Sequence, residues 1–318
     1  MFSINWEPKR GKGVFVRSIP QGSRVLDVGC GNNSPRWFRQ VRPDIYYIGI
    51  DVGDYGQQDD PRDYANEYII TEPELFAEGI AAYANSMDAV ICSHNLEHCN
   101  DPHAVLIAMT QALRPGGRLY LAFPCEESVG FPKRGGCLNF HDDRSHREVP
   151  NWNATLRALR DMDCDFLFVK KRYRPFPLFL RGLLMEPVSY WRRHVAPHGA
   201  TWALYGFESV IWARRKSCVF VKDWGVRATY AGIGVNVQPD GSSAIWIQLE
   251  DFIPSGDVFV EFNGLGRGIA TFSGGLLTAG IPSSVISTAG KYGVEVTDES
   301  GDRIPVGCFD VYPWRREC

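Results

Sequence analysis

Residues 141–146, HDDRSH, gather two histidines and two aspartates within six positions of the chain. Imidazoles and carboxylates at this spacing can form a general base or a substrate-binding pair, or they can hold a polar loop in place. Metal binding is a third use of such side chains, but the spacing matches no common ligand pattern and no second cluster accompanies it. We therefore expect no metal site, and we take His141, Asp142 and His146 as candidate catalytic residues.

A glycine-rich turn lies in VLDVGCGNNS, residues 25–34. Gly29 and Gly31 let the backbone bend tightly and approach a ligand, and the helix that follows presents its N-terminus there. Tight turns between a strand and a helix also use glycine for steric reasons alone. Asp51, however, ends the next expected strand 20 residues after Gly31, where a carboxylate can accept hydrogen bonds from both hydroxyls of a ribose. The spacing predicts a cofactor that contains ribose.

The residues around this turn distinguish between two cofactors that contain ribose, NAD and S-adenosylmethionine. Ser34 stands where the G-x-G-x-x-G motif of dinucleotide binders has its third glycine, and no Tyr-x-x-x-Lys pair occurs in the chain. The carboxylate of Asp27 would repel a pyrophosphate, whereas it suits a ligand that carries a sulfonium and an ammonium group. The turn favours S-adenosylmethionine, and an NAD-dependent reductase or epimerase is the weaker interpretation.

A sheet is needed to position these residues, and up to about residue 169 short β-type runs alternate with helical stretches. The expected strands cover residues 24–29, 45–51, 67–70, 87–94, 117–124, 165–171 and, after a long connection, 208–217. The expected helices cover residues 35–42, 73–85 and 101–115. Such alternation is typical of parallel strands with helices on both faces. The predicted fold class is α/β, with a Rossmann-like, doubly wound, mostly parallel seven-stranded sheet.

Three blocks of the sequence together resemble the class I S-adenosylmethionine-dependent methyltransferases of the type-11 group. They are VLDVGCG, YIGIDV and DAVICSHNLEHCNDPHAVLIAMTQALRPGGRLYLAFP at 88–124. The resemblance covers roughly residues 20–217 and implies that the strand at 208–217 lies antiparallel between the fifth and sixth strands. It implies S-adenosylmethionine as the cofactor, bound through Asp27, Gly29, Cys30 and Gly31 at the amino-acid end, Asp51 at the ribose, and Ser93 and His94 on the floor. For His98 and His103, helix capping and surface exposure are the favoured interpretation.

Residues 170–216 carry 10 Lys/Arg against 2 Asp/Glu, a local charge of +8 in a chain whose net charge is −3. Within residues 170–195 the cations are interleaved with large apolar side chains, which suits a membrane surface or an anionic ligand such as a lipid-linked phosphate. A lid or a dimer helix has the same composition, so a homo-oligomer is the alternative. The acidic balance of the whole chain and the lack of a stacking motif argue against nucleic acid as a partner.

Beyond about residue 220 the pattern changes to short alternating runs between Gly, Pro, Ser and Asp turns. The runs cover residues 226–231, 234–239, 244–250, 257–264, 292–298 and 308–313. They predict a C-terminal all-β domain, an immunoglobulin-like sandwich at 221–318. The preceding domain, 1–220, would carry a basic, aromatic insertion at about 172–207. No catalytic constellation is evident in the sandwich, which leaves glycan binding, oligomerisation or docking as its role.

Composition and length are those of an ordinary globular protein. The chain has 318 residues, 44% of them hydrophobic and 22% charged, which suggests about two domains. Neither a membrane-spanning run nor a signal-peptide core is evident, so we expect a cytoplasmic protein, or one peripheral to the inner face of the membrane. Nine scattered cysteines without a C-x-x-C pair argue against a disulfide framework.

Taken together, these patterns predict an S-adenosylmethionine-dependent methyltransferase. The 141–146 loop and the basic segment are loosely similar to methyltransferases associated with bacterial surface-polysaccharide synthesis. That similarity implies O-methylation of a glycan, a glycan precursor or another small-molecule acceptor. The alternative is a catalytically inactive scaffold that binds S-adenosylmethionine while its β-sandwich binds a partner or a glycan.

Overall fold

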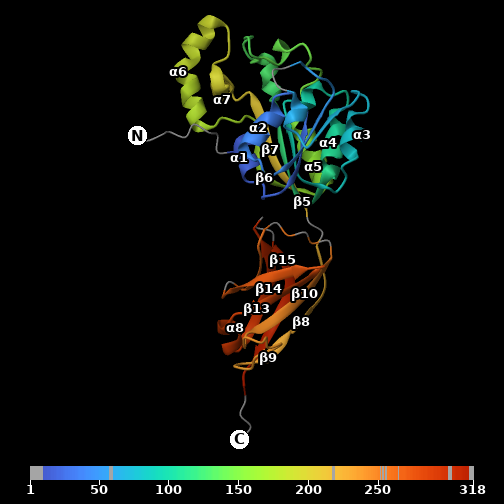
Figure 1. The fold of residues 1–318 in the computed structure, drawn as a ribbon. Helices are drawn as coiled ribbons and strands as arrows, with labels where there is room; N and C mark the ends of the chain where they lie inside the picture. The colour runs from blue at the N-terminus through green and yellow to red at the C-terminus, as the bar shows by residue number, and fades with distance from the viewer. Residues whose placement is uncertain are drawn as a thin grey trace. The chain divides into compact units, whose positions relative to one another are not determined.

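The computed structural model describes residues 10–56, 60–216, 219–250, 252, 254, 256–263, 265–299 and 303–314. Cys218 and Cys318 lie outside the described residues, as does the start of the N-terminal segment on which the expected lack of a signal peptide rests. The chain divides into two compact units, Met1–Lys216 and Ser217–Cys318. Figure 1 shows an α/β architecture for the first unit and a β architecture for the second.

Seven strands form the sheet of the first unit, in the order β3-β2-β1-β4-β5-β7-β6. They are β1 (Arg24–Val28), β2 (Tyr46–Asp51), β3 (Glu67–Ile70), β4 (Met87–Ser93), β5 (Leu113–Pro124), β6 (Cys164–Lys170) and β7 (Glu208–Arg215). All pairs are parallel except those of β7, which is antiparallel to β5 and β6. The seven expected strands and the antiparallel last strand are therefore confirmed. Strand order reverses beside β1, where ligands bind in open parallel sheets.

Helices cover both faces of this sheet, as the α/β prediction requires. The helices are α1 (Lys12–Arg17), α2 (Ser34–Val41), α3 (Phe76–Ala81), α4 (Pro102–Ala112), α5 (Trp152–Asp161), α6 (Phe176–Arg192) and α7 (Ala200–Tyr205). Successive residues of β1 point to opposite faces: Leu26 packs with side chains of α3, α4 and α5, and Val25 packs with those of α1 and α2. The two cores hold β1 and its glycine turn rigidly between two helical layers.

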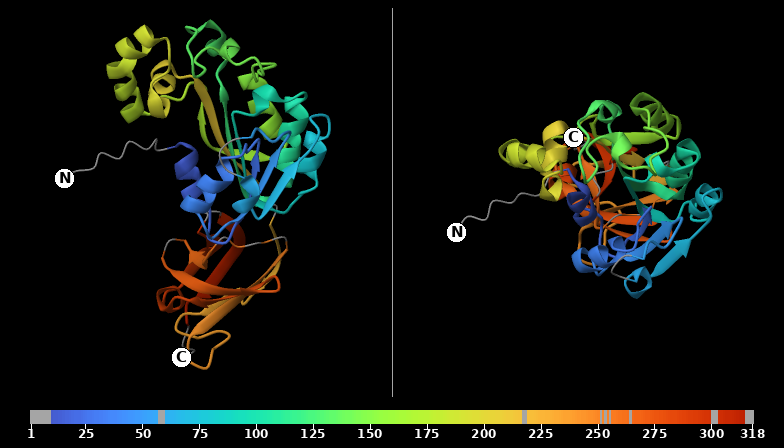
Figure 2. Two further views of the ribbon diagram at one scale, coloured as in Figure 1. Left: turned by 45° about the horizontal axis from the view of Figure 1, so that its top comes forward. Right: turned by 90° about the horizontal axis from the view of Figure 1, so that it is seen from above.

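The long connection before β7 was expected to be a basic, aromatic insertion at about 172–207. It forms the helix pair α6 and α7, which Figure 2 shows as a hairpin standing beside the sheet of the first unit. A Cβ atom on Gly182 would lie 2.2 Å from the carbonyl oxygen of Ala200. Glycine at this position therefore lets the two helices approach closely, and only one face of α6 is buried.

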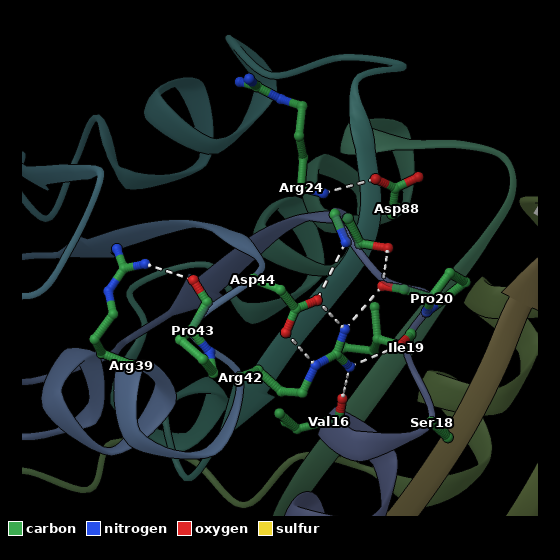
Figure 3. Close-up of polar contacts among 12 residues, drawn as sticks. Val16, Ser18, Ile19, Pro20, Arg24, Arg39, Arg42, Pro43, Asp44 and Asp88 are labelled. Atoms are coloured by element: carbon green, nitrogen blue, oxygen red, sulfur yellow. Dashed lines mark hydrogen bonds and ion pairs between the residues drawn. The ribbon is translucent and has the colours of Figure 1, made fainter.

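Arg42, at the end of α2, joins the segment before β1 to the segment before β2 (Figure 3). Its guanidinium donates to the carbonyl oxygens of Val16 (2.8 Å), Ile19 (2.6 Å) and Pro20 (2.9 Å). It also forms a two-pronged ion pair with Asp44, at 2.8 and 2.6 Å. This hydrogen bonding from Arg42 lowers the pKa of Asp44 to about 2. The network fixes the ends at which β1 and β2 enter the sheet.

The second unit consists of one eight-stranded sheet in the order β8-β10-β13-β12-β11-β14-β15-β9. Its elements are β8 (Phe220–Gly225), β9 (Ala228–Tyr230), β10 (Ser243–Glu250), β11 (Val258–Phe262), β12 (Arg267–Ser273), β13 (Leu276–Ile281), α8 (Ser283–Ser287), β14 (Gly290–Asp298) and β15 (Arg303–Tyr312). The all-β expectation is confirmed. Residues 234–239 were expected to be a strand, but Gln238 donates its N–H to the carbonyl of Ser242 in a turn.

This sheet is curled, whereas an immunoglobulin-like sandwich has two separate sheets. Register shifts occur where β10 meets β8 and where β14 meets β15, and such bulges bend a sheet. A Cβ atom on Gly307 of β15 would lie 2.7 Å from the ring of Trp224 in β8, although these strands stand near opposite ends of the strand order. The two ends therefore approach each other around one core, and Trp224 belongs to that core.

Candidate active site

A cavity of about 700 Å³ lies at the carboxyl ends of β1, β2 and β4. Its wall contains Gly29, Gly31, Asp51, Val52, Tyr55, His94, Asn95, His98, Arg144, Ser145, His146 and Arg147. The volume falls in the range of small-molecule and cofactor sites. All of these residues belong to the first unit.

The glycine turn needs glycine for both conformation and space. Gly29 and Gly31 have φ angles of +72° and +57°, a left-handed region that side chains disfavour. A Cβ atom on Gly29 would lie 2.1 Å from the side chain of Asn95, which is itself buried. The backbone of the turn thus reaches the cavity wall without any side chain of its own.

Asp51 ends β2 with its carboxylate buried at the cavity wall. Its oxygens accept hydrogen bonds from Gly31 N–H, Val52 N–H and the Tyr55 hydroxyl, each at 2.7 Å. An ionised carboxylate accepts about four hydrogen bonds, so one more donor can be added, and the Tyr55 hydroxyl can give way to another. This arrangement suits a ribose hydroxyl as the further donor.

Asp27 lies at the base of the turn and is 1% exposed. Its carboxylate accepts hydrogen bonds from the Ser34 hydroxyl (2.5 Å) and the Tyr47 hydroxyl (2.9 Å) and pairs with the Lys12 ammonium at 3.4 Å. Burial and the neighbouring Asp27 charge raise the pKa of Tyr47, so its phenol remains a donor. The carboxylate of Asp27 thus has protein partners around it in this structure.

His94 is held between two carboxylates on the cavity wall. Its Nε2 lies 2.8 Å from Glu208 Oε1, and its Nδ1 lies 3.3 Å from Glu97 Oε1. Burial lowers the pKa of this imidazole, but the hydrogen bonds to Glu208 and Glu97 outweigh burial and raise its pKa to about 10. His94 is therefore an imidazolium at neutral pH. The wall formed by the described residues does not include Ser93, Cys30 or Asp27.

The three candidate catalytic residues do not converge. Asp142 Oδ2 accepts backbone N–H groups of Arg134 (3.0 Å), Leu138 (3.1 Å) and Asn139 (2.8 Å), which is the bonding expected of a loop-pinning side chain. His141 is exposed, and its ring packs edge-on against Phe140. His146 alone of the three lines the cavity.

Several residues at or beside the cavity were not among the candidate site residues. Glu97 and His98 form the short helix η2 (Leu96–His98) directly after β4, and the ring of His98 lies 4.8 Å from that of His146. His98 was expected at the surface, yet it lines the cavity. Its place after a strand that ends at the carboxyl edge of the sheet was the available signal. The contribution of Arg144 and Arg147 to the cavity wall has no comparable signal in the sequence.

Comparison with known proteins agrees with this geometry. Residues 10–163 match the family described as "Methyltransferase domain". The chain is 34% identical over 126 residues to the ubiquinone biosynthesis O-methyltransferase of Xanthomonas axonopodis pv. citri, across 36% of this chain and 48% of that protein. It is 31% identical over 126 residues to the protein of the same name from Escherichia coli O127:H6, across 37% of this chain and 48% of that protein. The chain spans about half the length of the curated relatives that it matches.

Solved structures also resemble the first unit. An S-adenosylmethionine-dependent methyltransferase from Mesorhizobium loti aligns with a TM-score of 0.45 and 15% identity, over 64% of this chain and 96% of that chain. A putative sarcosine dimethylglycine methyltransferase from Galdieria sulphuraria aligns with a TM-score of 0.44 and 13% identity, over 64% of this chain and 82% of that chain.

Proposed function

We propose that this protein, whose residues 10–163 match a methyltransferase domain family, is an S-adenosylmethionine-dependent O-methyltransferase. The observation that carries the proposal is the buried Asp51 carboxylate beside the Gly29–Gly31 turn, at the point where the strand order reverses. The cavity in front of them has the volume of a cofactor site. The names of the matched relatives support oxygen as the acceptor atom.

The residues of the cavity fit the two ends of S-adenosylmethionine. Asp51 would bind the ribose hydroxyls, and the backbone of Gly29 and Gly31 would contact the amino-acid end. Asp27 would contribute its charge through the base of the turn, and His94 would form part of the floor. Cys30 would contribute only its backbone, because burial raises the pKa of its thiol.

When bound, S-adenosylmethionine supplies a methyl group on a sulfonium, and the acceptor oxygen forms the new C–O bond as the methyl–sulfur bond breaks and the acceptor's proton leaves. The protein's task is then to align the acceptor with that bond. Residues 144–147 and His98 line the same cavity as the turn. We place the acceptor oxygen beside these residues, where imidazoles and water are available for its proton.

Within this proposal, the acceptor is a glycan precursor carried on a lipid phosphate. Arg144 and Arg147 line the cavity, and guanidinium groups bind phosphate through paired charge-assisted hydrogen bonds. A lipid-linked acceptor also accounts for the exposed apolar face of α6. The relatives act in ubiquinone biosynthesis according to their names, so a phenolic quinone precursor is the acceptor class to compare.

A transfer assay tests this function. Protein is incubated with S-adenosylmethionine labelled in its methyl group and with lipid-linked glycan extracts, or with demethylated quinone precursors. Label in the glycan lipid supports the proposal, and label only in the phenol replaces the acceptor class. Cofactor binding without transfer to any extract supports the scaffold alternative, in which the second unit does the binding.

We further assign the exposed face of α6 to the surface of an anionic membrane. The helix exposes Phe176, Leu180, Leu183, Leu184, Val188, Tyr190 and Trp191, which share one side of an α-helix at 100° per residue. Arg181 and Arg192 border this apolar face, and Arg193 follows it. Large apolar side chains flanked by arginines are typical of helices that lie in a membrane interface. None of the described helices is long and apolar enough to cross a membrane.

Replacing Leu184 and Trp191 together by serine should reduce binding to vesicles of anionic phosphatidylglycerol at least about tenfold. The two side chains are 81% and 80% exposed, so folding should not change. Burial of each side chain in the membrane interface would contribute roughly 1.5–3 kcal/mol to binding. Vesicle co-sedimentation measures the effect.

Val129→Ser, at another exposed apolar position, is the matched control and should bind like wild type. High salt should weaken wild-type binding, because the arginines contribute charge attraction. Unchanged binding of the double variant would refute the assignment. So would a wild-type dimer that the double variant converts to a monomer without any vesicle binding, which would make a second copy the occupant of this face.

A further inference from the structure

Three side chains at the cavity carry atoms that could bind a cation together: His98 and His146 line it, and Glu97 is buried next to them. One carboxylate oxygen of Glu97 and one ring nitrogen each of His98 and His146 lie within 4.8 Å of one another. Glu97 and His98 follow β4, whereas His146 lies 48 residues further along the chain, after β5. Sequence spacing within residues 141–146 argued against a metal there. The structure instead combines His146 with residues from a different segment.

Glu97 is the anionic member of this group, and within the described residues only one of its two carboxylate oxygens has a hydrogen-bond partner. Its side chain is fully buried. Oε1 pairs with His94, but the buried Oε2 has no hydrogen-bond partner among the described residues. A buried charged oxygen without a donor is unfavourable by several kcal/mol, and native proteins normally supply a donor or a cation.

The hydrogen bonds of the two histidines leave their Nε2 atoms available as ligands. His146 Nδ1 lies 2.6 Å from the carbonyl oxygen of Phe140, and because a carbonyl only accepts, Nδ1 must carry the proton. His98 Nδ1 lies 3.0 Å from Ser145 Oγ. That hydroxyl already donates its one proton to Asp143 Oδ1 at 2.6 Å, so His98 Nδ1 must also be the donor. The tautomer that these hydrogen bonds select presents the lone pair of Nε2 in each ring.

This is the outer-shell pattern of metal-binding histidines, in which a carbonyl or an anchored oxygen accepts the Nδ1 proton and orients the ring. The ring of His146 is further fixed by stacking on Phe140, with centroids 4.6 Å apart. The two segments are tied together directly, because Arg147 donates its backbone N–H to the carbonyl of Glu97 at 2.8 Å.

We propose that Glu97, His98 and His146 bind a divalent first-row transition-metal ion that keeps an open coordination position toward the cavity. Two imidazoles and one carboxylate are a ligand set of catalytic zinc and of other first-row ions. The role of this ion rests on the proposed methyl transfer. The ion would bind the acceptor oxygen and lower the pKa of its hydroxyl. The released proton would pass to water, and the two imidazoles would serve as ligands in place of acting as bases.

Zinc and cobalt titrations test the site without cofactor or acceptor. Apoprotein prepared with a chelator should bind one Zn²⁺ in competition with a chromophoric chelator, and Co²⁺ should give visible absorption bands from nitrogen ligation. His98→Ala, His146→Ala and Glu97→Gln should each weaken Zn²⁺ binding by more than about 100-fold, since loss of an outer-shell partner alone costs about 10–100-fold. Ser145→Ala, which removes the partner of His98 Nδ1 but no ligand atom, should fall within that 10–100-fold range.

His103→Ala is the matched control, because His103 is exposed on the neighbouring helix α4 and should leave binding unchanged. The proposal is overturned if wild type fails to bind either ion, or if the ligand variants bind Zn²⁺ as His103→Ala does. Circular dichroism of each variant identifies any variant that does not fold. If a ligand variant does not fold, the Zn²⁺ affinity of Ser145→Ala still tests the proposal. S-adenosylmethionine titrated into the same apoprotein reports on the proposed function separately.

Discussion

Asp51→Asn is expected to weaken S-adenosylmethionine binding about 10- to 100-fold. The carboxylate lies at the end of β2 on the cavity wall and already accepts three hydrogen bonds at 2.7 Å. An amide loses the charge that strengthens hydrogen bonds to ribose hydroxyls, an effect of about 1–3 kcal/mol, and each 1.4 kcal/mol is about tenfold in affinity. Calorimetric titration of S-adenosylmethionine and its demethylated product measures the change.

Two further variants make that result specific. Asp165→Asn changes an exposed carboxylate on β6 and should leave affinity unchanged. Tyr55→Phe removes a donor that competes for Asp51, so affinity should stay the same or rise. If Asp51→Asn binds S-adenosylmethionine as tightly as wild type does, Asp51 is not the residue that binds the ribose. No binding by wild type would refute the proposed cofactor use altogether.

The largest effect on stability is expected from Arg42→Met, at about 3 kcal/mol. The substitution removes the hydrogen-bond donor of the carbonyl oxygens of Val16, Ile19 and Pro20. It also removes the ion-pair partner of Asp44 (Figure 3). Loss of one partner from a partly buried charged network costs on the order of 3 kcal/mol. Denaturant unfolding measures the loss, and hydrogen exchange of β1 and β2 locates it in the first unit. Arg62→Met, which breaks an ion pair whose two side chains are both more than half exposed, should cost less than about 1 kcal/mol.

The same network predicts a pH dependence. Arg42 lowers the pKa of Asp44 to about 2, below its ordinary value of 3.8. A lowered pKa in the folded state stabilises the protein fully above the ordinary value, and this stabilisation disappears as the pH falls through about 2. The stability difference between wild type and Arg42→Met should therefore shrink between about pH 4 and pH 2. An unchanged difference across that range would show that the ion pair with Asp44 does not contribute.

Local patterns were sufficient for the framework of this protein. The seven strands of the first unit, the place of Asp51 at the end of β2 and the glycine turn were all predictable, because alternation of apolar residues and a demand for positive φ are properties of a few neighbouring residues. The same reasoning left the segment of α6 and α7 open, because its mixed basic and apolar composition fits several structures, a lid or dimer helix among them. It also predicted two sheets in the second unit where one curled sheet forms, because bulges and the approach of β8 to β15 depend on distant pairing.

The sequence by itself therefore determined the α/β class, the position of the glycine turn and the methyltransferase resemblance. The tertiary structure alone decided which titratable groups act together. It separated His141 and Asp142 from the cavity and brought His146 to Glu97 and His98. The physical reason is that a side chain's chemistry depends on its burial and its partners. Those are set by the path of the loops after β4 and β5, which no local pattern encodes.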